Sequence, residues 1–495
     1  MTPLRFALGL LLCVAAAAAA AGEAMPSFEP GKPLPKEVLA HVPVKAVVAE
    51  FLDPDELGIG KEVGFLLWRE ILSAISDQAG AGVILAYPPG KERLTDLLAR
   101  DYHDAALRIA QSQKARMAIW GAIAKDDDRL LLDTYLSLVG EMPREELALR
   151  LKYGLPGEPQ KDTGFAARLS RTNFNFPRVE TTRAALFERA LTTQVDGASV
   201  RERSGGGAVR ATLAAESALQ AMDMQGSWFQ VRLPDGREGW IDSRQVRVPP
   251  PQLQARQSVV LRASAGAGPV LTEPVATAGG LLPAGTRMTV LASRYLDKNG
   301  MWYQIEAGDR RGWVPAREVF TRYSLPVVHF VAGLYRYQRG RYDDAAREFE
   351  QYTLADGVRA DPPSLSSAYQ MLAASRVMAA SAERKLNRQE TSREVERALE
   401  QAQQTTPYDP GVFTLRAVTS LAAGNSVAAA LRQVNRALEL DVDNRDARLI
   451  LGRMNDLNVK PSDPALQIFQ RDLLERPQVR DEIRSLNERY RMAPR

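Results

Sequence analysis

A short pattern built around two tryptophans occurs twice in this chain, and it constrains the fold more than any other feature. The first copy reads GSWFQV at residues 226–231 and PDGREGWI at residues 234–241. The second copy reads MWYQI at residues 301–305 and GDRRGWV at residues 308–314. In each copy, alternating apolar residues predict two half-buried strands, and Pro-Asp-Gly or Gly-Asp-Arg predicts the turn between them. The pattern therefore predicts two β-hairpins.

Each hairpin follows a matching upstream segment, ASVRERSG at residues 198–205 and VVLRASAG at residues 259–266. This arrangement resembles a tandem pair of bacterial-type Src-homology-three domains. The family pattern is an apolar-x-apolar-Arg start, a Gly- or Pro-rich loop, a Gly-x-Trp-x-x-Val strand and a closing Gly-Trp-apolar strand. Both copies carry this pattern, and they differ in the loop before the first tryptophan, which is longer in copy two.

The resemblance implies two small β-barrels. Because barrels of this size have little other core, we expect the closing Gly-Trp pair of each copy to lie inside. The predicted core residues are Trp240, Trp313, Gly239 and Gly312. The alternative is that tryptophans form an exposed platform for a ligand, for which Trp228 and Trp302 are the candidate contact residues.

The amino terminus has the composition of a secretory signal peptide. Arg5 precedes an apolar run at residues 6–21, and small residues follow it. We expect residues 1–24 to be removed and the mature chain to be exported, to the periplasm or another extracytoplasmic compartment. Cys13 is the one cysteine in the sequence, so the mature chain would hold no disulfide and no thiolate metal site. No other apolar run reaches membrane-spanning length, so we expect no transmembrane segment in the mature chain.

An extended leader at residues 25–43 precedes a segment in which strands and helices alternate, at residues 44–140. This order implies a small α/β layer. It resembles the amino-terminal domain of the translocation protein TolB and of related lipoproteins that activate penicillin-binding proteins. The resemblance rests on residues 46–52, the helix from Lys61, and residues 118–123. The predicted strands are residues 46–51, 82–87, 117–123 and 130–139, and the predicted helices are near residues 63–75 and 101–114.

Two stretches of this layer are similar to ligand sites. Residues 58–61 (GIGK) follow a strand and precede a helix, where backbone N–H groups can cradle a phosphate, but they lack the P-loop spacing. A turn and helix cap is the simpler interpretation. Asp126, Asp127 and Asp128 offer oxygens to a metal ion, yet a calcium loop spreads its ligands over about a dozen residues. A solvated hairpin turn is favoured here.

The chain between the recognisable segments gives weaker signals. Residues 141–191 contain several breakers and no clear period, so we assign them only as an uncertain connecting region. The first barrel is predicted at residues 192–248 and the second at residues 256–322. Pro249, Pro250 and Pro251 begin a Pro-rich linker at residues 249–255, which we expect to be extended and stiff.

From residue 326 the period becomes helical. The spacing of Gly333, Gly340, Tyr342, Ala345 and Phe349 resembles that of a tetratricopeptide repeat, in which helix pairs stack through small residues. The predicted repeats are residues 326–460, with a first helix pair at 329–353, further helices near 364–386, 392–405, 412–423 and 426–440, a helix that starts near residue 444, and capping helices at 461–495. The fragment from residue 326 to the end should fold alone. Side chains of the first helix in each pair would line a concave groove, which makes Phe330, Leu334 and Tyr337 candidate contact residues, although core packing is an equally open interpretation.

Catalytic motifs are weak in this sequence. Peptidases that accompany bacterial Src-homology-three domains need a Cys-His pair or zinc-binding histidines. This chain has three histidines, His41, His103 and His329, which are far apart in sequence, and it has no Gly-x-Ser-x-Gly motif. We therefore expect no catalytic residues, no metal ligands and no cofactor.

Charge argues against a nucleic-acid partner. The 64 basic residues are nearly balanced by 60 acidic residues, for a net charge of +4, and no basic cluster stands out. The predicted fold class is multidomain α+β, with a small α/β amino-terminal domain, two small β-barrels and a carboxy-terminal α-helical repeat solenoid. The predicted function is a non-enzymatic exported adaptor that binds protein partners in the cell envelope. The alternative is a peptidoglycan-binding protein or a regulator of cell-wall synthesis enzymes, and a cell-wall hydrolase is third.

Overall fold

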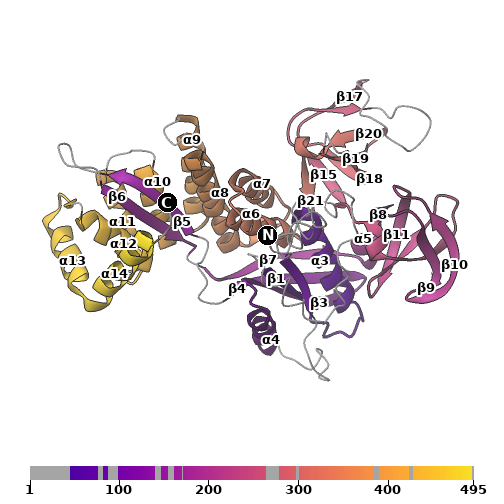
Figure 1. Cartoon of the computed structure of the whole chain (residues 1–495), viewed down its shortest axis with the longest axis horizontal. Helices are drawn as coiled ribbons and strands as arrows, with labels where there is room; N and C mark the ends of the chain where they lie inside the picture. The colour runs from indigo at the N-terminus through magenta and orange to yellow at the C-terminus, as the bar shows by residue number, and fades with distance from the viewer. Residues whose placement is uncertain are drawn as a thin grey trace, which may run out of the picture. The chain divides into compact units, whose positions relative to one another are not determined.

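The chain forms two compact units in a computed structural model (Figure 1). The first comprises Met1–Leu136 and Arg178–Val328, and the second comprises Ser137–Pro177 and His329–Arg495. The structure describes residues 45–75, 82–86, 99–139, 146–153, 161–169, 171–262, 278–296, 300–382, 389–422, 427–456 and 458–492. The predicted signal peptide and leader, with Cys13 and His41, lie outside these ranges. The described residues confirm a mixed α/β architecture with several antiparallel sheets and a helical carboxy-terminal region.

The first unit opens with a sheet whose described strands have the order β2-β1-β3-β4-β7. β1 pairs in parallel with both β2 and β3. The first four strands lie where the sequence predicts strands, whereas β7 comes from the connecting region that the sequence left unassigned. The strands are β1 (Lys45–Ala49), β2 (Gly82–Ala86), β3 (Met117–Asp126), β4 (Arg129–Leu138) and β7 (Asn173–Thr181).

Two helices pack on this sheet, α3 (Gly60–Ile75) and α4 (Ala99–Ser112). α3 is amphipathic by sequence, with Val63, Leu67 and Ile71 on the face that packs against the strands. Its charged residues Glu62 and Glu70 are buried as well. A helix that buries charged side chains must give them partners, and these partners lie in the following β-structure.

Two sheets of identical strand order follow in the first unit. The order is β10-β9-β13-β12-β11-β8-β14 in the first, and β17-β16-β20-β19-β18-β15-β21 in the second. We call them β-module 1 (residues 189–247) and β-module 2 (residues 252–322). Each begins a few residues before its predicted start, because the opening strands β8 and β15 carry none of the tryptophan pattern.

The strands of β-module 1 follow the short helix α5 (Arg183–Phe187). They are β8 (Arg189–Thr193), β9 (Ala198–Arg203), β10 (Gly206–Leu213), β11 (Ala218–Gln225), β12 (Trp228–Arg232), β13 (Glu238–Asp242) and β14 (Val246–Arg247). Those of β-module 2 are β15 (Gln252–Ala255), β16 (Val259–Arg262), β17 (Ala278–Leu282), β18 (Arg287–Leu296), β19 (Gly300–Ala307), β20 (Arg310–Pro315) and β21 (Val319–Arg322). A single 3₁₀ turn precedes the last strand of each module, at Ser243–Gln245 and Ala316–Glu318.

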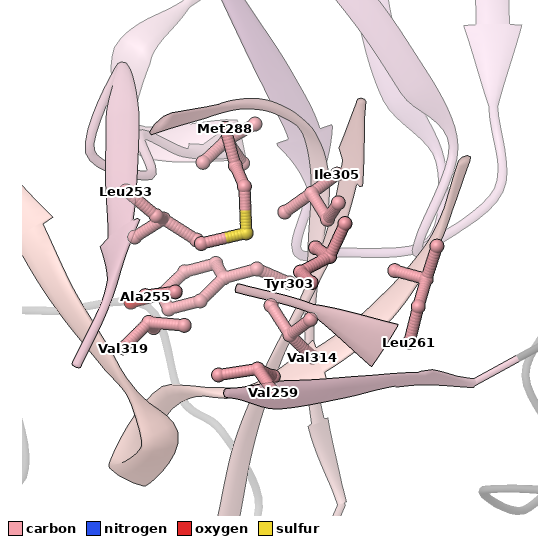
Figure 2. Packing of buried hydrophobic residues seen from close by; sticks show 11 residues of the cluster. Leu253, Ala255, Val259, Leu261, Met288, Tyr303, Ile305, Val314 and Val319 are labelled. Atoms are coloured by element: carbon pink, nitrogen blue, oxygen red, sulfur yellow. The ribbon is translucent and has the colours of Figure 1, made fainter. Parts of the chain in front are cut away.

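The core of β-module 2 is built from alternate residues of its strands (Figure 2). Tyr303 and Ile305 of β19 point inward, and Val314 of β20 meets them from the neighbouring strand. The remaining members come from the other strands and are also buried. They are Leu253, Ala255, Val259, Leu261, Leu282, Met288, Val290 and Val319.

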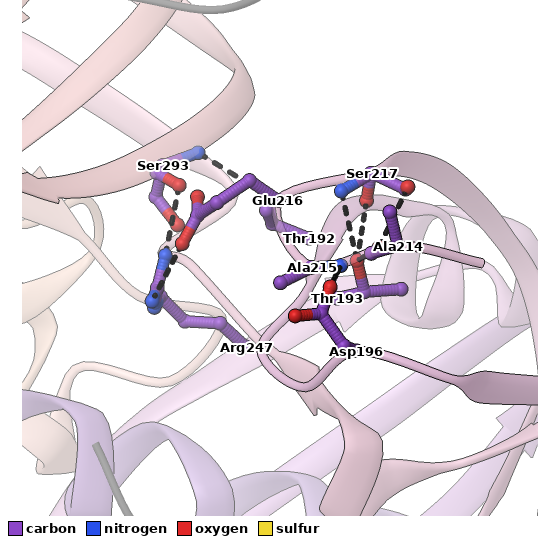
Figure 3. A network of polar contacts seen from close by, with 9 residues as sticks. All are labelled: Thr192, Thr193, Asp196, Ala214, Ala215, Glu216, Ser217, Arg247 and Ser293. Atoms are coloured by element: carbon purple, nitrogen blue, oxygen red, sulfur yellow. Dashed lines mark hydrogen bonds and ion pairs between the residues drawn. The ribbon is translucent and has the colours of Figure 1, made fainter. Parts of the chain in front are cut away.

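Polar contacts join the two modules (Figure 3). Arg247 of β14 donates to the backbone oxygen of Ser293 in β18 at 2.9 Å, and it pairs with Glu216 at 3.4 Å. The Ser293 N–H donates to the Thr192 hydroxyl of β8 at 3.4 Å. The predicted Pro-rich linker therefore does not act as a free spacer, because part of it forms β15 and side chains on both sides of it hold the modules together.

The second unit consists of successive helices and one segment from the connecting region. The helices are α6 (Val327–Gln338), α7 (Tyr342–Thr353), α8 (Pro362–Ala382), α9 (Gln389–Thr405), α10 (Pro410–Ala422), α11 (Val427–Leu440), α12 (Arg445–Asp456), α13 (Pro464–Glu475) and α14 (Pro477–Met492), with a 3₁₀ turn at Val358–Ala360. α7 and α9 both pack on α8, and α10 packs on α11. Gly333 allows α6 to cross α7 closely, since a Cβ there would lie 2.8 Å from the Phe349 ring.

The segment at residues 137–177, which we call the cis segment, belongs to this helical unit. It contains an antiparallel hairpin of β5 (Glu146–Tyr153) and β6 (Lys161–Arg168), and then the first part of β7. β5 contacts α8 and α10, and β6 contacts α10 and α12. The unassigned stretch of sequence is thus a structural partner of the helices. Within the described ranges, no helix combines the length and the apolar character needed to cross a bilayer.

Candidate binding surfaces

The tryptophans of β-module 1 lie on the outer face of its sheet. Side chains alternate along a strand, so Trp228 and Gln230 of β12 lie on one face while Phe229 and Val231 lie on the other. Phe229 and Val231 are fully buried, whereas Trp228 and Trp240 are partly exposed. The prediction that Trp240 fills the core is therefore wrong, because alternation gives the core positions to its neighbours in sequence.

Strand register places four side chains of β-module 1 in a row. Arg201 of β9 lies opposite Trp240 of β13, Trp240 lies opposite Gln230 of β12, and Gln230 lies opposite Asp223 of β11. Directly opposite residues share a face of the sheet. Trp228 lies on the same face two residues before Gln230. Together these residues form a surface of two indole rings, a guanidinium, an amide and a carboxylate, which we call the tryptophan face.

β-module 2 repeats this row with one change. Arg262 lies opposite Trp313, Trp313 lies opposite Gln304, and Gln304 lies opposite Ala292. The arginine, tryptophan and glutamine are thus the same in both modules, and alanine stands where β-module 1 has aspartate. The arginine and the glutamine recur in both copies of the sequence pattern, but the pattern alone does not show that they share a face with the tryptophan.

The tryptophans on the corresponding face of β-module 2 are buried. Trp302 and Trp313 are only 1% and 2% exposed, and they form a small cluster with Ala292 that is separate from the core in Figure 2. The Arg262 guanidinium lies 4.9 Å from the centre of the Trp302 ring, in a cation–π contact. Trp302 is consequently not an exposed platform residue. Trp313 is buried as predicted, but outside the barrel-like core.

A single position accounts for part of this difference. Ala292 is small and apolar, so both indoles of β-module 2 can pack beside it. Asp223 occupies the equivalent place in β-module 1, and its carboxylate pairs with Arg183 of α5 at 3.1 Å. A solvated ion pair at that position cannot serve as a cover for an indole ring, and the tryptophan face of β-module 1 stays partly open.

The glycine before the second tryptophan allows close approach of strands in both modules. A Cβ on Gly239 would lie 2.6 Å from a methyl group of Val200 and 2.7 Å from the backbone oxygen of Arg201. A Cβ on Gly312 would lie 2.6 Å from the Leu261 side chain. Any larger residue would push apart the strands that carry the arginine and tryptophan of each row.

Helix α3 holds β-module 1 in place. The Gly226 N–H, in the turn just before Trp228, donates to the Glu62 carboxylate at 2.8 Å. Arg69 donates to the backbone oxygens of Ser243 at 3.2 Å and Val246 at 2.8 Å. Burial lowers the pKa of Arg69 to about 10, which leaves it charged at neutral pH. The α/β layer thereby fixes the turn that leads into the tryptophan face.

The predicted groove residues of the helices are all buried. Phe330 and Leu334 are fully inaccessible and Tyr337 is 5% exposed. The Phe330 ring packs 4.9 Å from Phe174 and 5.5 Å from Phe176, both in β7. These three helical residues therefore pack in the core, and the alternating Asn-Phe-Asn-Phe at residues 173–176 was the sequence signal for their partner.

The two loops that are similar to ligand sites have structural roles. The Asp53 carboxylate accepts hydrogen bonds from the Leu57 N–H at 3.0 Å and the Ile59 N–H at 3.2 Å, so backbone donors near the GIGK stretch are already used. Asp127 has a positive φ of 51° in the turn between β3 and β4. In the described parts of the chain, no group of three or more His, Cys, Asp and Glu side chains is arranged to hold a metal ion.

The two described histidines lie in packed surroundings. His103 of α4 lies 5.4 Å from the Trp120 ring, measured between ring centres. His329 of α6 is buried, and its Nδ1 atom lies 3.0 Å from a carboxylate oxygen of Glu348. Arg336 also approaches Glu348, at 3.5 Å. His329 thus belongs to a charged network between α6 and α7.

One carboxyl group has a strongly altered pKa. Burial raises the pKa of Glu50 from 4.5 to about 7, and the charges of Glu62 and Asp53 add to the increase while Lys61 opposes it. Glu50 lies at the end of β1 beside the start of α3. Tyr102 is a further neighbour, and burial, with the charge of Glu50, raises its pKa.

A cavity of about 430 Å³ lies among α8, α9, α10 and α11. Its lining includes Arg393, Glu396 and Arg416, together with several hydroxyl groups. Arg416 pairs with Glu396 at 2.9 Å and is 13% exposed, so its charge is already balanced within the chain. The cavity is partly open, and its lining mixes apolar and polar side chains.

Comparisons with known proteins assign no family to this chain. No family model matches the chain, and no curated protein matches it. Among solved structures, the NlpC2 protein of Trichomonas vaginalis is similar at 12% identity and a TM-score of 0.15, over 28% of this chain and 49% of that one. The NlpC1 protein of the same organism is similar at 13% identity and a TM-score of 0.14, over 27% of this chain and 46% of that one. The chain thus spans about half the length of these structures, and TM-scores this low assign neither fold nor function.

Proposed function

We propose that this protein is a non-enzymatic binding protein of the cell envelope, an exported adaptor that contacts its partner through the tryptophan face of β-module 1. The proposal rests on the different exposure of the same row of side chains in the two modules. The same Arg-Trp-Gln row is partly open in β-module 1, where Trp228 and Trp240 are accessible, and closed in β-module 2. Accessible indole rings beside polar groups are typical of binding surfaces, since tryptophan, tyrosine and arginine are enriched among the few residues that dominate the free energy of binding.

The resemblance of the two modules to bacterial Src-homology-three domains, and of the helices to tetratricopeptide repeats, supports this proposal. Their identical strand order and the successive helices agree with such a layout. The secretory composition of residues 1–24 supports export, and with it a partner in the envelope. We further propose that the chain does not catalyse, since the families that its segments resemble are interaction modules.

The tryptophan face favours a second candidate ligand, which is peptidoglycan. A flat indole ring next to an amide side chain suits a sugar ring, which has one apolar face and polar groups at its edge. Trp240 and Gln230 are direct cross-strand neighbours. The two candidates differ in the ligand and share the surface, so one pair of variants tests both.

The test uses the mature chain and the variants Trp228→Ala and Trp240→Ala. We expect each to weaken binding by about 1–2 kcal/mol or more, roughly tenfold in affinity, while the thermal melt stays cooperative. Binding is measured by co-sedimentation with purified sacculi, and by cross-linking in the envelope followed by identification of the linked protein. Loss in the first assay only identifies peptidoglycan as the ligand, and loss in the second only identifies a protein.

The matched control is Leu281→Ala, an exposed apolar residue on β17 of β-module 2, away from the tryptophan face of β-module 1. It should bind as the unaltered chain does. Unchanged binding of both tryptophan variants in both assays would rule out the tryptophan face as the binding surface.

A further inference from the structure

The cavity among α8, α9, α10 and α11 is a candidate site for a small ligand. Its volume of about 430 Å³ lies in the range of small-molecule sites, and it is partly open to solvent. Both helices of two neighbouring pairs line it, so it differs from a surface made by the first helices of the pairs alone. Protein interiors contain few voids larger than a water molecule, so a space of this size beside packed helices results from a particular choice of side chains.

Short side chains on three helices leave this space. Ser392 lies in the first turn of α9, Ser420 near the end of α10, and Ala429 near the start of α11, and all three line the cavity. Leu399 of α9 and Leu421 of α10, by contrast, are buried in the packed parts of the same helices. Because serine and alanine are too short to fill the separation between neighbouring helices, the sequence itself keeps the cavity open.

Polar side chains that lack partners within the chain line the same cavity. They include the hydroxyls of Ser392 and Ser420 and the amide of Gln433. Among the described residues, none of these three side chains forms a hydrogen bond within the chain. Hydroxyl and amide groups can both donate and accept, which suits the hydroxyl groups of a sugar. The buried Val377 and Val395 add apolar surface, which suits the apolar face of a sugar ring.

The lining carries one positive charge that it does not balance. Arg416 pairs with Glu396 at 2.9 Å, whereas Arg393 is a second guanidinium that no carboxylate pairs with among the described residues. The Nε atom of Arg416 is buried and, within the described ranges, has no hydrogen-bond partner. An acceptor that reaches this N–H would offset the free energy lost by burying it unpaired. A ligand with a single negative charge therefore suits the cavity best.

We propose that this cavity binds a small sugar that carries one acidic group. The acidic group pairs with Arg393, the sugar hydroxyls bond to the serine and glutamine side chains, and the valines contact the ring. This inference concerns the helical unit and does not depend on the tryptophan face, so the two can fail separately.

Isothermal titration calorimetry on the mature chain tests the proposal with four probes. Glucuronate carries a carboxylate and glucose 6-phosphate carries a phosphate, so the tighter of the two identifies the acidic group. Glucose has the hydroxyl groups without the charge, and acetate has the charge without the hydroxyl groups. We expect saturable binding of at least one acidic sugar, and binding of glucose and acetate that is weaker by about tenfold or more.

Two variants test whether the ligand lies in the cavity. Arg393→Gln removes the unbalanced charge from an exposed side chain, so the chain should fold normally and bind the acidic sugar roughly tenfold more weakly. Ser420→Leu keeps every charge and fills part of the cavity, so it should weaken binding by about tenfold as well. The matched control is Arg397→Gln, which removes the same charge from an exposed position of α9 outside the lining and should bind within about twofold of the unaltered chain.

Circular dichroism melts establish that the variants are folded, and Arg393→Gln decides alone if Ser420→Leu is not. A lack of saturable binding by both acidic sugars would overturn the proposal, and so would an affinity for glucose or acetate equal to that for the acidic sugars. Unchanged binding by Arg393→Gln would place the ligand elsewhere. An equal loss in Arg397→Gln and Arg393→Gln would mean that general surface charge, and not the cavity, attracts the acid, which also overturns the proposal.

Discussion

The most deeply buried charges of the first unit connect three segments that are far apart in sequence. Arg189 of β8 and Glu70 of α3 form an ion pair at 2.8 Å, and each side chain is only 1% exposed. The Ser324 N–H and hydroxyl both donate to the Glu70 carboxylate, at 3.1 Å and 2.7 Å. Arg189 also donates to the backbone oxygen of Leu186. Each carboxylate oxygen therefore has a partner, as a buried charge requires.

Replacing one member of this pair should damage the first unit. We expect Glu70→Ala to lower the free energy of unfolding by about 3–5 kcal/mol, because Arg189 would stay buried without its counter-charge. Urea unfolding followed by tryptophan fluorescence measures the change. The control is Glu238→Ala, which breaks an exposed pair with Arg232 at 3.0 Å and should cost at most about 1 kcal/mol. Equal losses in the two variants would contradict this account.

The raised pKa of Glu50 predicts how the free energy of unfolding changes with pH. Its folded pKa of about 7 lies above its ordinary value of 4.5, so the folded state binds the proton more tightly than the unfolded state. Stability from this group is therefore present below about pH 4.5 and is lost as the pH rises to about 7. Glu50→Gln should remove this slope and raise stability at pH 8 by roughly 1–2 kcal/mol, a figure reduced to allow for partial exposure.

Thermal melts between pH 5 and pH 8 measure this effect. The exposed Asp104 of α4 offers the matched control Asp104→Asn, which should leave the slope unchanged. If Glu50→Gln and the unaltered chain keep parallel stability curves over this range, burial of Glu50 is not the source of the pH dependence.

At the scale of elements, the two β-modules share one strand order but differ in what covers their outer face. Trp313 is packed with Trp302 and Ala292, whereas Trp240 is partly exposed. Removal of a buried aromatic ring leaves a cavity, and removal of a partly exposed ring does so to a smaller extent. The same substitution should therefore have different effects in the two modules.

We expect Trp313→Ala to destabilise its module by about 3–5 kcal/mol and Trp240→Ala by roughly half of that or less. Chemical denaturation of the full chain, with the remaining tryptophans as probes, gives both values. A Trp240→Ala variant that loses more stability than Trp313→Ala would mean that the difference in burial between the modules does not determine their stability.

The helices of the second unit share their core with the cis segment. Phe330 lies 5.6 Å from Phe349 and 5.5 Å from Tyr352, and Phe174 and Phe176 complete this aromatic group. Without the cis segment, the apolar face of α6 would be exposed to water. The expectation that residues 326–495 fold alone needs correction for this reason.

A fragment of residues 326–495 should melt at a lower temperature than a fragment in which residues 137–177 are joined to it by a flexible linker. We expect the joined form to regain a cooperative helical transition, because it restores the burial of two phenylalanines, worth about 1.5–3 kcal/mol each. Circular dichroism at 222 nm follows both. In the joined form, Phe176→Ala should cancel most of the gain, and the exposed Asn173→Ala should keep it.

At the scale of the whole molecule, the first unit is joined across its segments by polar contacts between residues far apart in sequence. Glu62, Arg69 and Glu70 of α3 all bond to β-module 1 or to residues beside it. Arg247 and Thr192 then join β-module 1 to β-module 2. Three segments that differ in sequence pattern are therefore joined by specific polar contacts within the first unit.

Export and the lack of catalysis are predictions about the whole chain. We expect the envelope fraction to contain a protein that begins near Gly22 or Met25, as determined by amino-terminal sequencing. The purified protein should release no muropeptides from sacculi, in chromatography that detects a known hydrolase at the same concentration. A chain that keeps Met1 in the cytoplasm would contradict export, and released muropeptides would contradict the binding role.

The sequence by itself determined the local structure. Repeated Trp hairpins, alternating apolar strands and helical periodicity all depend on residues within a few positions of each other, and β1, β3, β12, β13, α3 and α8 lie where those signals place them. Local signals of this kind do not include strand register. The pairing register of β12 with β13 places Phe229 in the core and Trp228 on the outer face, although both residues are large and aromatic.

Only the tertiary structure decided which surfaces are free. The cis segment has weak local signals, and its partner Phe330 follows Phe174 by more than 150 positions, so nothing in either stretch specifies the other. The closure of Trp302 by Arg262 and Ala292 likewise depends on three strands that meet in space. Burial is a property of all the neighbours of a side chain, and most of those neighbours are distant in sequence.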